Sequence, residues 1–252
     1  MLRDKRTLKV LICFIFINFL FIGYAFGQVT ENKIKQLDIH LVPSKAVIAQ
    51  IKSFNNLLKK KGILKKYGIT PFLDKHPVHL TLYLTDFNIA KLPEIEKNIS
   101  DLAKKNSTFN FKTTGIVAGK SGFVLLMVNN TKDLNGKLSK QQQLSNQVIS
   151  LLEKYRYKNA AMPGWVKYYP QKIISFKKYG SPNAFSQFNP HFSILAVSLK
   201  NKELKNSFIK DMNKVIKEFK FKPVEAKITA IGVGEVNKDG QITKEIKTIP
   251  LK

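Results

Sequence analysis

The feature that most constrains this chain is a short alternating pattern that occurs twice. In a strand over residues 78–85, His79 and Thr81 fall on one face and the leucines fall on the other. The imidazole and the hydroxyl then lie about 7 Å apart along the strand. Residues 191–197 have the same pattern, with His191 and Ser193 on one face and apolar side chains opposite. Two of the four histidines therefore share one setting, and we expect the fold to bring these two strands side by side.

Hydrophobic periodicity around the two motifs predicts an α+β order of elements. The expected strands span residues 37–43, 79–85, 109–117, 122–128, 172–176, 191–198, 222–236 and 241–248. The expected helices span residues 45–60, 93–105, 134–155 and 201–219. An Asp239-Gly240 pair between the last two strands is typical of a hairpin turn.

Each half of the chain places its motif strand before a helix and closes with two strands. We therefore predict a bilobal α+β fold, in which duplicated lobes with pseudo-twofold symmetry hold antiparallel sheets flanked by helices. The predicted domain covers residues 28–252, with a first lobe at about 37–130 and a second at about 131–252. Such symmetry would place both motif strands around one cleft.

The net charge of the chain indicates which classes of binding partner it favours. A formal net charge of +26 over 252 residues favours polyanions, which include nucleotides, nucleic acid and anionic membrane or wall surfaces. The lysines are spread along the chain rather than clustered, so a lysine-rich surface without a specific partner is the competing interpretation. No stable protein partner is predicted.

The first 27 residues are typical of a secretion signal. A basic start that includes Arg3 and Lys9 precedes an apolar run over residues 10–22, and Ala25-Phe26-Gly27 offers small residues for cleavage after Gly27. We expect a periplasmic or secreted protein, with a retained N-terminal anchor as the alternative. The single cysteine, Cys13, lies in this segment, so the mature chain would have no disulfide and no thiolate metal site.

Two histidines across a cleft are suited to general acid–base chemistry, because an imidazole gains or loses a proton near neutral pH. In a displacement at phosphorus, one ring takes a proton from the nucleophile and the other gives one to the leaving oxygen. The hydroxyls of Thr81 and Ser193 are placed to donate to non-bridging phosphate oxygens. This design needs no metal and no cofactor, and which histidine is the acid stays open.

The two tetrapeptides, His79-Leu80-Thr81-Leu82 and His191-Phe192-Ser193-Ile194, resemble the paired His-x-Thr/Ser-x motifs of the two-histidine (2H) phosphoesterase superfamily. The nearest resemblance is to its bacterial 2′-5′ RNA ligase-like and cyclic phosphodiesterase branch, over roughly residues 37–249. It implies a bilobal α+β fold, metal-independent phosphodiester hydrolysis and, commonly, the opening of 2′,3′-cyclic phosphates at RNA ends. A secretion signal is unusual for the intracellular RNA-processing members, which leaves the substrate class less certain than the chemistry.

The segments before the second motif supply candidates for substrate binding, namely Trp165, Lys178, Tyr179 and Phe188. Aromatic rings can stack a base and lysines can hold a phosphate, although loop aromatics more often pack on their own domain. The predicted function is an exported phosphodiesterase acting on a 2′,3′-cyclic or 2′-5′ nucleotide or oligonucleotide. The alternative is a non-catalytic protein of the same fold that binds nucleic acid or an anionic surface.

Overall fold

The structure is a computed structural model that describes residues 33–252 with the exception of residue 120. The predicted signal peptide over residues 1–27, its cleavage after Gly27 and the localisation that depends on it lie outside the described residues. Within the described part of the chain, no helix has both the length and the apolar character needed to cross a membrane.

All strand pairings in the described residues are antiparallel, and the strands follow the order β2-β1-β6-β3-β4-β5, with β7 paired to β6. This arrangement, together with its flanking helices, confirms the predicted α+β class. The strands are β1 (Ile34–Pro43), β2 (Leu80–Asn88), β3 (Phe109–Ala118), β4 (Phe123–Val128), β5 (His191–Ala196), β6 (Glu225–Val236) and β7 (Ile242–Pro250).

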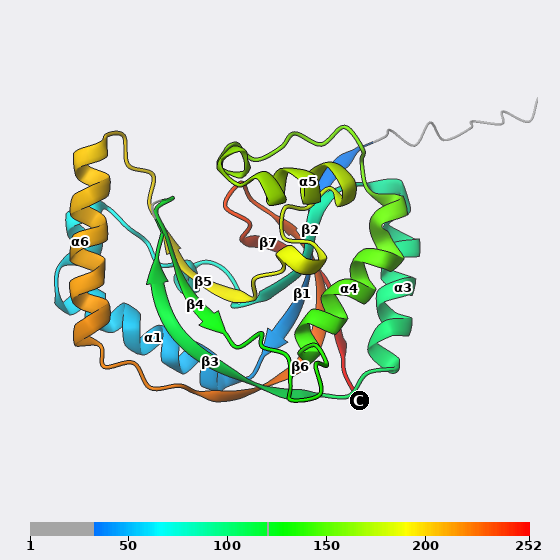
Figure 1. Cartoon of the computed structure of the whole chain (residues 1–252), viewed down its shortest axis with the longest axis horizontal. Helices are drawn as coiled ribbons and strands as arrows, with labels where there is room; N and C mark the ends of the chain where they lie inside the picture. Colours follow the sequence, from blue (N-terminus) through cyan, green and yellow to red (C-terminus); the bar gives the residue numbers. More distant parts are fainter. Residues whose placement is uncertain (1–32, 120) are drawn as a thin grey trace, which may run out of the picture. The chain divides into compact units, whose positions relative to one another are not determined.

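Helices lie on both sides of the strands, with α1 and α6 on one side and α3, α4 and α5 on the other (Figure 1). The α-helices are α1 (Lys45–Lys60), α2 (Ile63–Tyr67), α3 (Leu92–Lys104), α4 (Lys140–Leu152), α5 (Pro170–Tyr179) and α6 (Lys202–Glu218). Short 3₁₀ helices are η1 (Phe72–Asp74), η2 (Ile89–Lys91), η3 (Glu153–Tyr155), η4 (Gly164–Tyr168) and η5 (Phe185–Gln187).

Strand β3 changes partners along its length. Its residues 109–112 pair with β6, whereas its later residues, from Thr113 on, pair with β4, with a register shift between Thr113 and Gly115. A strand that switches partners at such an irregularity turns a corner between two sets of strands. The two ends of the strand order, β2 and β5, contact each other. The motif strands therefore lie side by side, as their shared pattern predicts.

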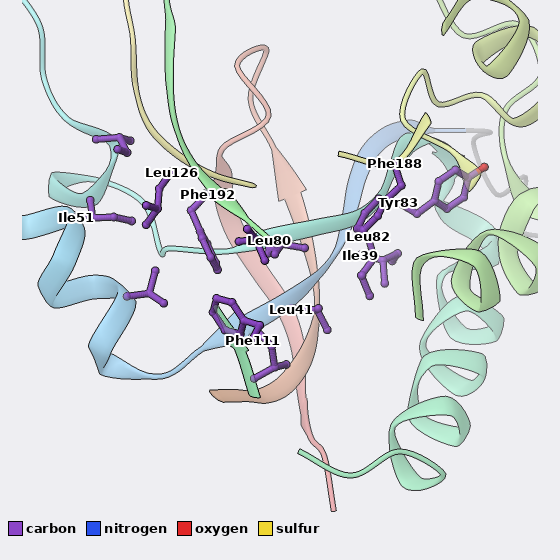
Figure 2. Close-up of a cluster of buried hydrophobic side chains, with 14 of the residues drawn as sticks. Ile39, Leu41, Ile51, Leu80, Leu82, Tyr83, Phe111, Leu126, Phe188 and Phe192 are labelled. Carbon is purple, nitrogen blue, oxygen red and sulfur yellow. The ribbon is translucent and has the colours of Figure 1, made fainter. Parts of the chain in front are cut away.

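The hydrophobic core joins strands from both parts of the sheet. Figure 2 shows Ile39 and Leu41 of β1, Leu80 of β2 and Phe192 of β5 in one cluster, and all four are almost fully buried. Strands β6 and β7 come late in the chain but complete the part of the sheet that contains β1. Strands from both sides of residue 130 pair with one another. The boundary between two lobes near this residue therefore stays a prediction.

Two predicted elements differ from the structure. The strand expected over residues 172–176 is wrong, because these residues belong to helix α5. Pro170 stands at the first turn of this helix, and Gly180 ends it with a left-handed φ of 72°. The helix expected from residue 134 begins only at Lys140, where the Ser139 hydroxyl accepts a hydrogen bond from the backbone N–H of Gln142.

Candidate active site

The two motif histidines are anchored in the same way. Nδ1–H of His79 donates to the backbone carbonyl of Pro77 at 3.0 Å, and Nδ1–H of His191 donates to that of Asn189 at 2.7 Å. In each motif the acceptor lies two residues before the ring. Because a carbonyl oxygen only accepts, each ring must carry its proton on Nδ1. This leaves Nε2 as the second titrating nitrogen of each ring.

The rings interact through their charges. Burial lowers the pKa of His191 most, and the positive charges of His79 and Lys172 lower this pKa further, against the opposing bond to Asn189. The charge of His79 contributes to this lowering, and β5 contacts β2, which begins directly after His79. A lowered pKa keeps His191 neutral near pH 7, and its Nε2 has no hydrogen-bond partner among the described residues. His191 is therefore equipped to accept a proton.

The surroundings of His79 favour the protonated ring instead. Burial by itself would lower its pKa, but the hydrogen bond and negative charge of Asp38 outweigh this effect, so the pKa lies above its ordinary value. Nε2 faces the carbonyl oxygen of Gly240 at 3.2 Å and Oδ2 of Asp38 at 3.4 Å. Both ring nitrogens therefore face acceptors, an environment that only the doubly protonated imidazolium satisfies. His79 is equipped to donate a proton.

The two motif hydroxyls differ in their bonding. Thr81 Oγ1 donates to Oδ2 of Asp38 at 2.6 Å, so its proton is committed within the protein. Ser193 is partly exposed, and its hydroxyl has no hydrogen-bond partner in the described part of the chain. Ser193 is thus free to donate to a bound phosphate oxygen, whereas the phosphate-binding role of Thr81 stays a prediction.

The four candidates for substrate binding occupy different settings. Trp165 in η4 is 39% exposed, and Lys178 is exposed with its Nζ 5.1 Å from the ring centroid of Tyr179. Tyr179 is partly buried, and its backbone carbonyl accepts the Tyr83 hydroxyl at 2.6 Å. Phe188 is only 8% exposed and belongs to the core, which leaves little of its ring for a substrate.

The structure places two further residues at the site, Asp38 on β1 and Lys172 on α5. Lys172 is held by the side-chain oxygen of Asn183 at 2.6 Å and the carbonyl of Gln187 at 3.3 Å, with Nζ 5.9 Å from the Trp165 ring centroid. Burial lowers the pKa of Lys172, and its charge in turn lowers that of His191. Lys172 therefore places a positive charge beside the second motif.

No group of three or more His, Cys, Asp or Glu side chains is arranged to hold a metal ion within residues 33–119 and 121–252. The carboxylate of Asp38 instead contacts Thr81 and His79. The geometry of the site is suited to proton transfer between side chains and a bound group.

No protein-family model matches the chain, and no curated protein matches it. Among solved structures, the protein TT0787 of Thermus thermophilus aligns with a TM-score of 0.52 at 12% identity, over 86% of this chain and 97% of that chain. At this identity the likeness establishes a shared fold.

Two further structures align with TM-scores below 0.5, too low to bear on function. Usb1 of Kluyveromyces marxianus has a TM-score of 0.43 at 16% identity, over 88% of this chain and 100% of that chain. LigT of E. coli, complexed with ATP, has a TM-score of 0.47 at 12% identity, over 87% of this chain and 99% of that chain. The activity of this chain therefore has to follow from the chemistry of its own site.

Proposed function

We propose that this protein is an exported phosphodiesterase that cleaves its substrate by general acid–base catalysis with His79 and His191. One observation carries the proposal: two histidines from distant segments share the same anchoring, interact electrostatically and have pKa values shifted in opposite directions. The resemblance of both motifs to the 2H phosphoesterase superfamily supports it, and so does the α+β fold.

The protonation states suggest the division of labour. Nε2 of His191, neutral at physiological pH, takes the proton from the attacking hydroxyl as the new P–O bond forms. Nε2–H of His79 gives its proton to the leaving oxygen as the old P–O bond breaks. The cycle ends with His191 protonated and His79 neutral, and proton exchange with water restores both. Because the base has the lower pKa, neutral His191 together with protonated His79 is the dominant combination at pH values between the two pKa values.

Other side chains complete the site. The free hydroxyl of Ser193 donates to a non-bridging oxygen, and the charge of Lys172 offsets the negative charge that develops on the phosphate. Trp165 offers an exposed ring face for a base. The proposed substrate is a 2′,3′-cyclic or 2′-5′ nucleotide or oligonucleotide, because such groups combine a phosphodiester with a stackable base.

The test is a screen of 2′,3′-cyclic nucleotides and 2′-5′-linked dinucleotides with the purified protein in excess chelator, with products identified by mass spectrometry. We expect turnover of at least one class, with the mass and retention of the product showing which P–O bond breaks. Absence of turnover across both classes would contradict the proposal.

A second candidate function is the binding of nucleic acid or an anionic surface without catalysis. It is favoured by the segment 154–190, which contains no Asp or Glu and holds seven basic residues, Lys154, Arg156, Lys158, Lys167, Lys172, Lys177 and Lys178. Trp165, Tyr168 and Tyr169 are exposed in the same segment. Binding of this kind weakens steeply with salt and is indifferent to the loss of His79 or His191, whereas the catalytic proposal requires both rings.

A further inference from the structure

We propose that Asp38 of β1 is a positioning residue that orients the His79 ring and holds its transferable proton, so that the first motif works as an Asp–His–Thr unit. The inference rests on the proposed function, because it assigns His79 a proton to deliver. Nothing in the two motifs themselves points to Asp38, which lies about forty residues before His79 in the chain.

The contacts of Asp38 come from strand pairing. Strands β1 and β2 are antiparallel neighbours, with a register shift between Ile39 and His40. At this point the carboxylate of Asp38, 0% exposed, reaches across to β2. A single oxygen, Oδ2, accepts the Thr81 hydroxyl at 2.6 Å and faces Nε2 of His79 at 3.4 Å. Thr81 thereby fixes the carboxylate, and the carboxylate fixes the ring.

The second carboxylate oxygen of Asp38 is buried at an energetic cost. Oδ1 of Asp38 is buried and has no hydrogen-bond partner in the described residues. A buried acceptor without a partner is unfavourable, and more so when it is charged. An apolar residue at this position would avoid this cost, since the position of Asp38 is itself fully buried. A buried carboxylate with one unpaired oxygen is better explained by its effect on His79 than by packing.

A layer behind His79 keeps the ring in place. His40 packs edge-on against it with the ring centroids 5.5 Å apart, and Nε2 of His40 faces Oε2 of Glu245 at 3.4 Å. Gly232 of β6 makes room for His40, because a Cβ at Gly232 would lie 2.1 Å from Nε2 of His40. With His40 behind and Gly240 and Asp38 at Nε2, the ring has little freedom to turn.

The electrostatic surroundings of His79 include groups from several elements. Asp38 and His40 come from β1, Glu245 comes from β7, and His191 comes from β5. Among the groups that affect its protonation most, Asp38 is the one carboxylate whose hydrogen bond and charge both raise the pKa of His79. Removal of this carboxylate should therefore change the titration of the ring more than the loss of any other single charge.

The test replaces Asp38 by Asn, which keeps the shape and an acceptor oxygen for Thr81 but removes the charge. NMR titration of the ring nitrogens in the full chain should show the His79 pKa lower by about one unit or more in D38N, the size expected for losing an opposite charge at this distance. In the pH profile of kcat/KM, the limb at high pH should move down by the same amount. The value of kcat should fall about tenfold or more, with KM little changed.

Two further variants make the result decisive. Asp38→Glu keeps the charge and should restore a large part of the His79 shift, whereas a purely structural role would not distinguish Glu from Asn. Asp101→Asn removes a partly exposed carboxylate on α3 that pairs with Lys97, and it should leave both the His79 titration and kcat unchanged. An unchanged His79 titration in folded D38N would overturn the inference. If the unmodified protein opens no phosphodiester, the proposed function fails, while the ring titration still decides whether Asp38 controls the protonation of His79.

Discussion

The two motif strands offer the same residues in different surroundings. His79 lies directly before β2, where it is buried and surrounded by acceptors, and the Thr81 hydroxyl on β2 is bonded to Asp38. On β5, His191 has a free Nε2, and the Ser193 hydroxyl has no partner among the described residues. The backbone anchors the rings identically, so the difference arises from the neighbouring strands. In the proposed mechanism, the first motif holds a proton and the second receives one.

Under the proposed mechanism, this contrast lets a symmetric pattern carry out an asymmetric reaction. A displacement at phosphorus needs a base on one side and an acid on the other, and identical motifs would compete for the same proton. Asp38 contacts the first motif directly, whereas its charge has only the smallest of the named effects on the pKa of His191, which it raises. The surroundings, rather than the motif, set the roles.

Removal of either ring should have the largest effect. We expect His79→Ala and His191→Ala each to lower kcat/KM for the best phosphodiester substrate by about 10²–10⁴-fold, the usual contribution of a general acid or base. His76→Ala is the matched control, because His76 lies three residues before His79 and donates instead to the carbonyl of Ile242 at 2.8 Å. Full activity in either motif variant would contradict the pairing.

Removal of each motif hydroxyl should have a smaller effect on kcat, and the effect on the pH profile should differ between the two motifs. Ser193→Ala removes a free donor and should lower kcat about tenfold without moving the pH profile, because Ser193 contacts no titrating partner. Thr81→Val removes the bond that fixes Asp38 and should lower kcat and also shift the limb at high pH. Steady-state rates measured across pH distinguish the outcomes, and identical profiles for both variants would show that the two sides are equivalent.

Binding on the side of the second motif should depend on Trp165. For a substrate with a base able to stack, Trp165→Ala should raise KM several-fold with kcat nearly unchanged, since stacking contributes about 1–3 kcal/mol per base. Tyr157→Ala is a suitable control, because Tyr157 is similarly exposed at 37% but belongs to neither η4 nor α5. Equal KM values for the Trp165 and Tyr157 variants would remove Trp165 from the site.

The smallest expected effect is on stability. Because the pKa of His79 is raised in the folded state, its pairing with Asp38 stabilises the fold fully below the unfolded pKa of histidine. This contribution is lost as pH rises through the folded value. Urea unfolding should therefore show an advantage of the unmodified protein over D38N, on the order of 1 kcal/mol, that shrinks as pH rises. An advantage independent of pH would mean that Asp38 acts through packing alone.

Much of this organisation is visible in the sequence because it depends on local periodicity. The pattern around His79 and His191 identifies both strands, and helix α1 spans the predicted residues 45–60. Asp38 escapes prediction because a single carboxylate in a strand gains meaning only when β1 pairs with β2. Lys172 lies in a run with Ile173 and Ile174 that resembles a strand, and the helix there depends on the caps at Pro170 and Gly180. Local pattern found the motifs, whereas their partners depend on tertiary pairing.

The most direct test of the acid–base pair is a comparison of kcat/KM for His79→Ala, His191→Ala and the double variant on one phosphodiester substrate. If the two rings serve a single concerted step, the double variant should be scarcely slower than either single variant, because losing one partner already disables the other. Losses that multiply would show two independent contributions, and a single variant with full activity would show that the rings do not act as a pair.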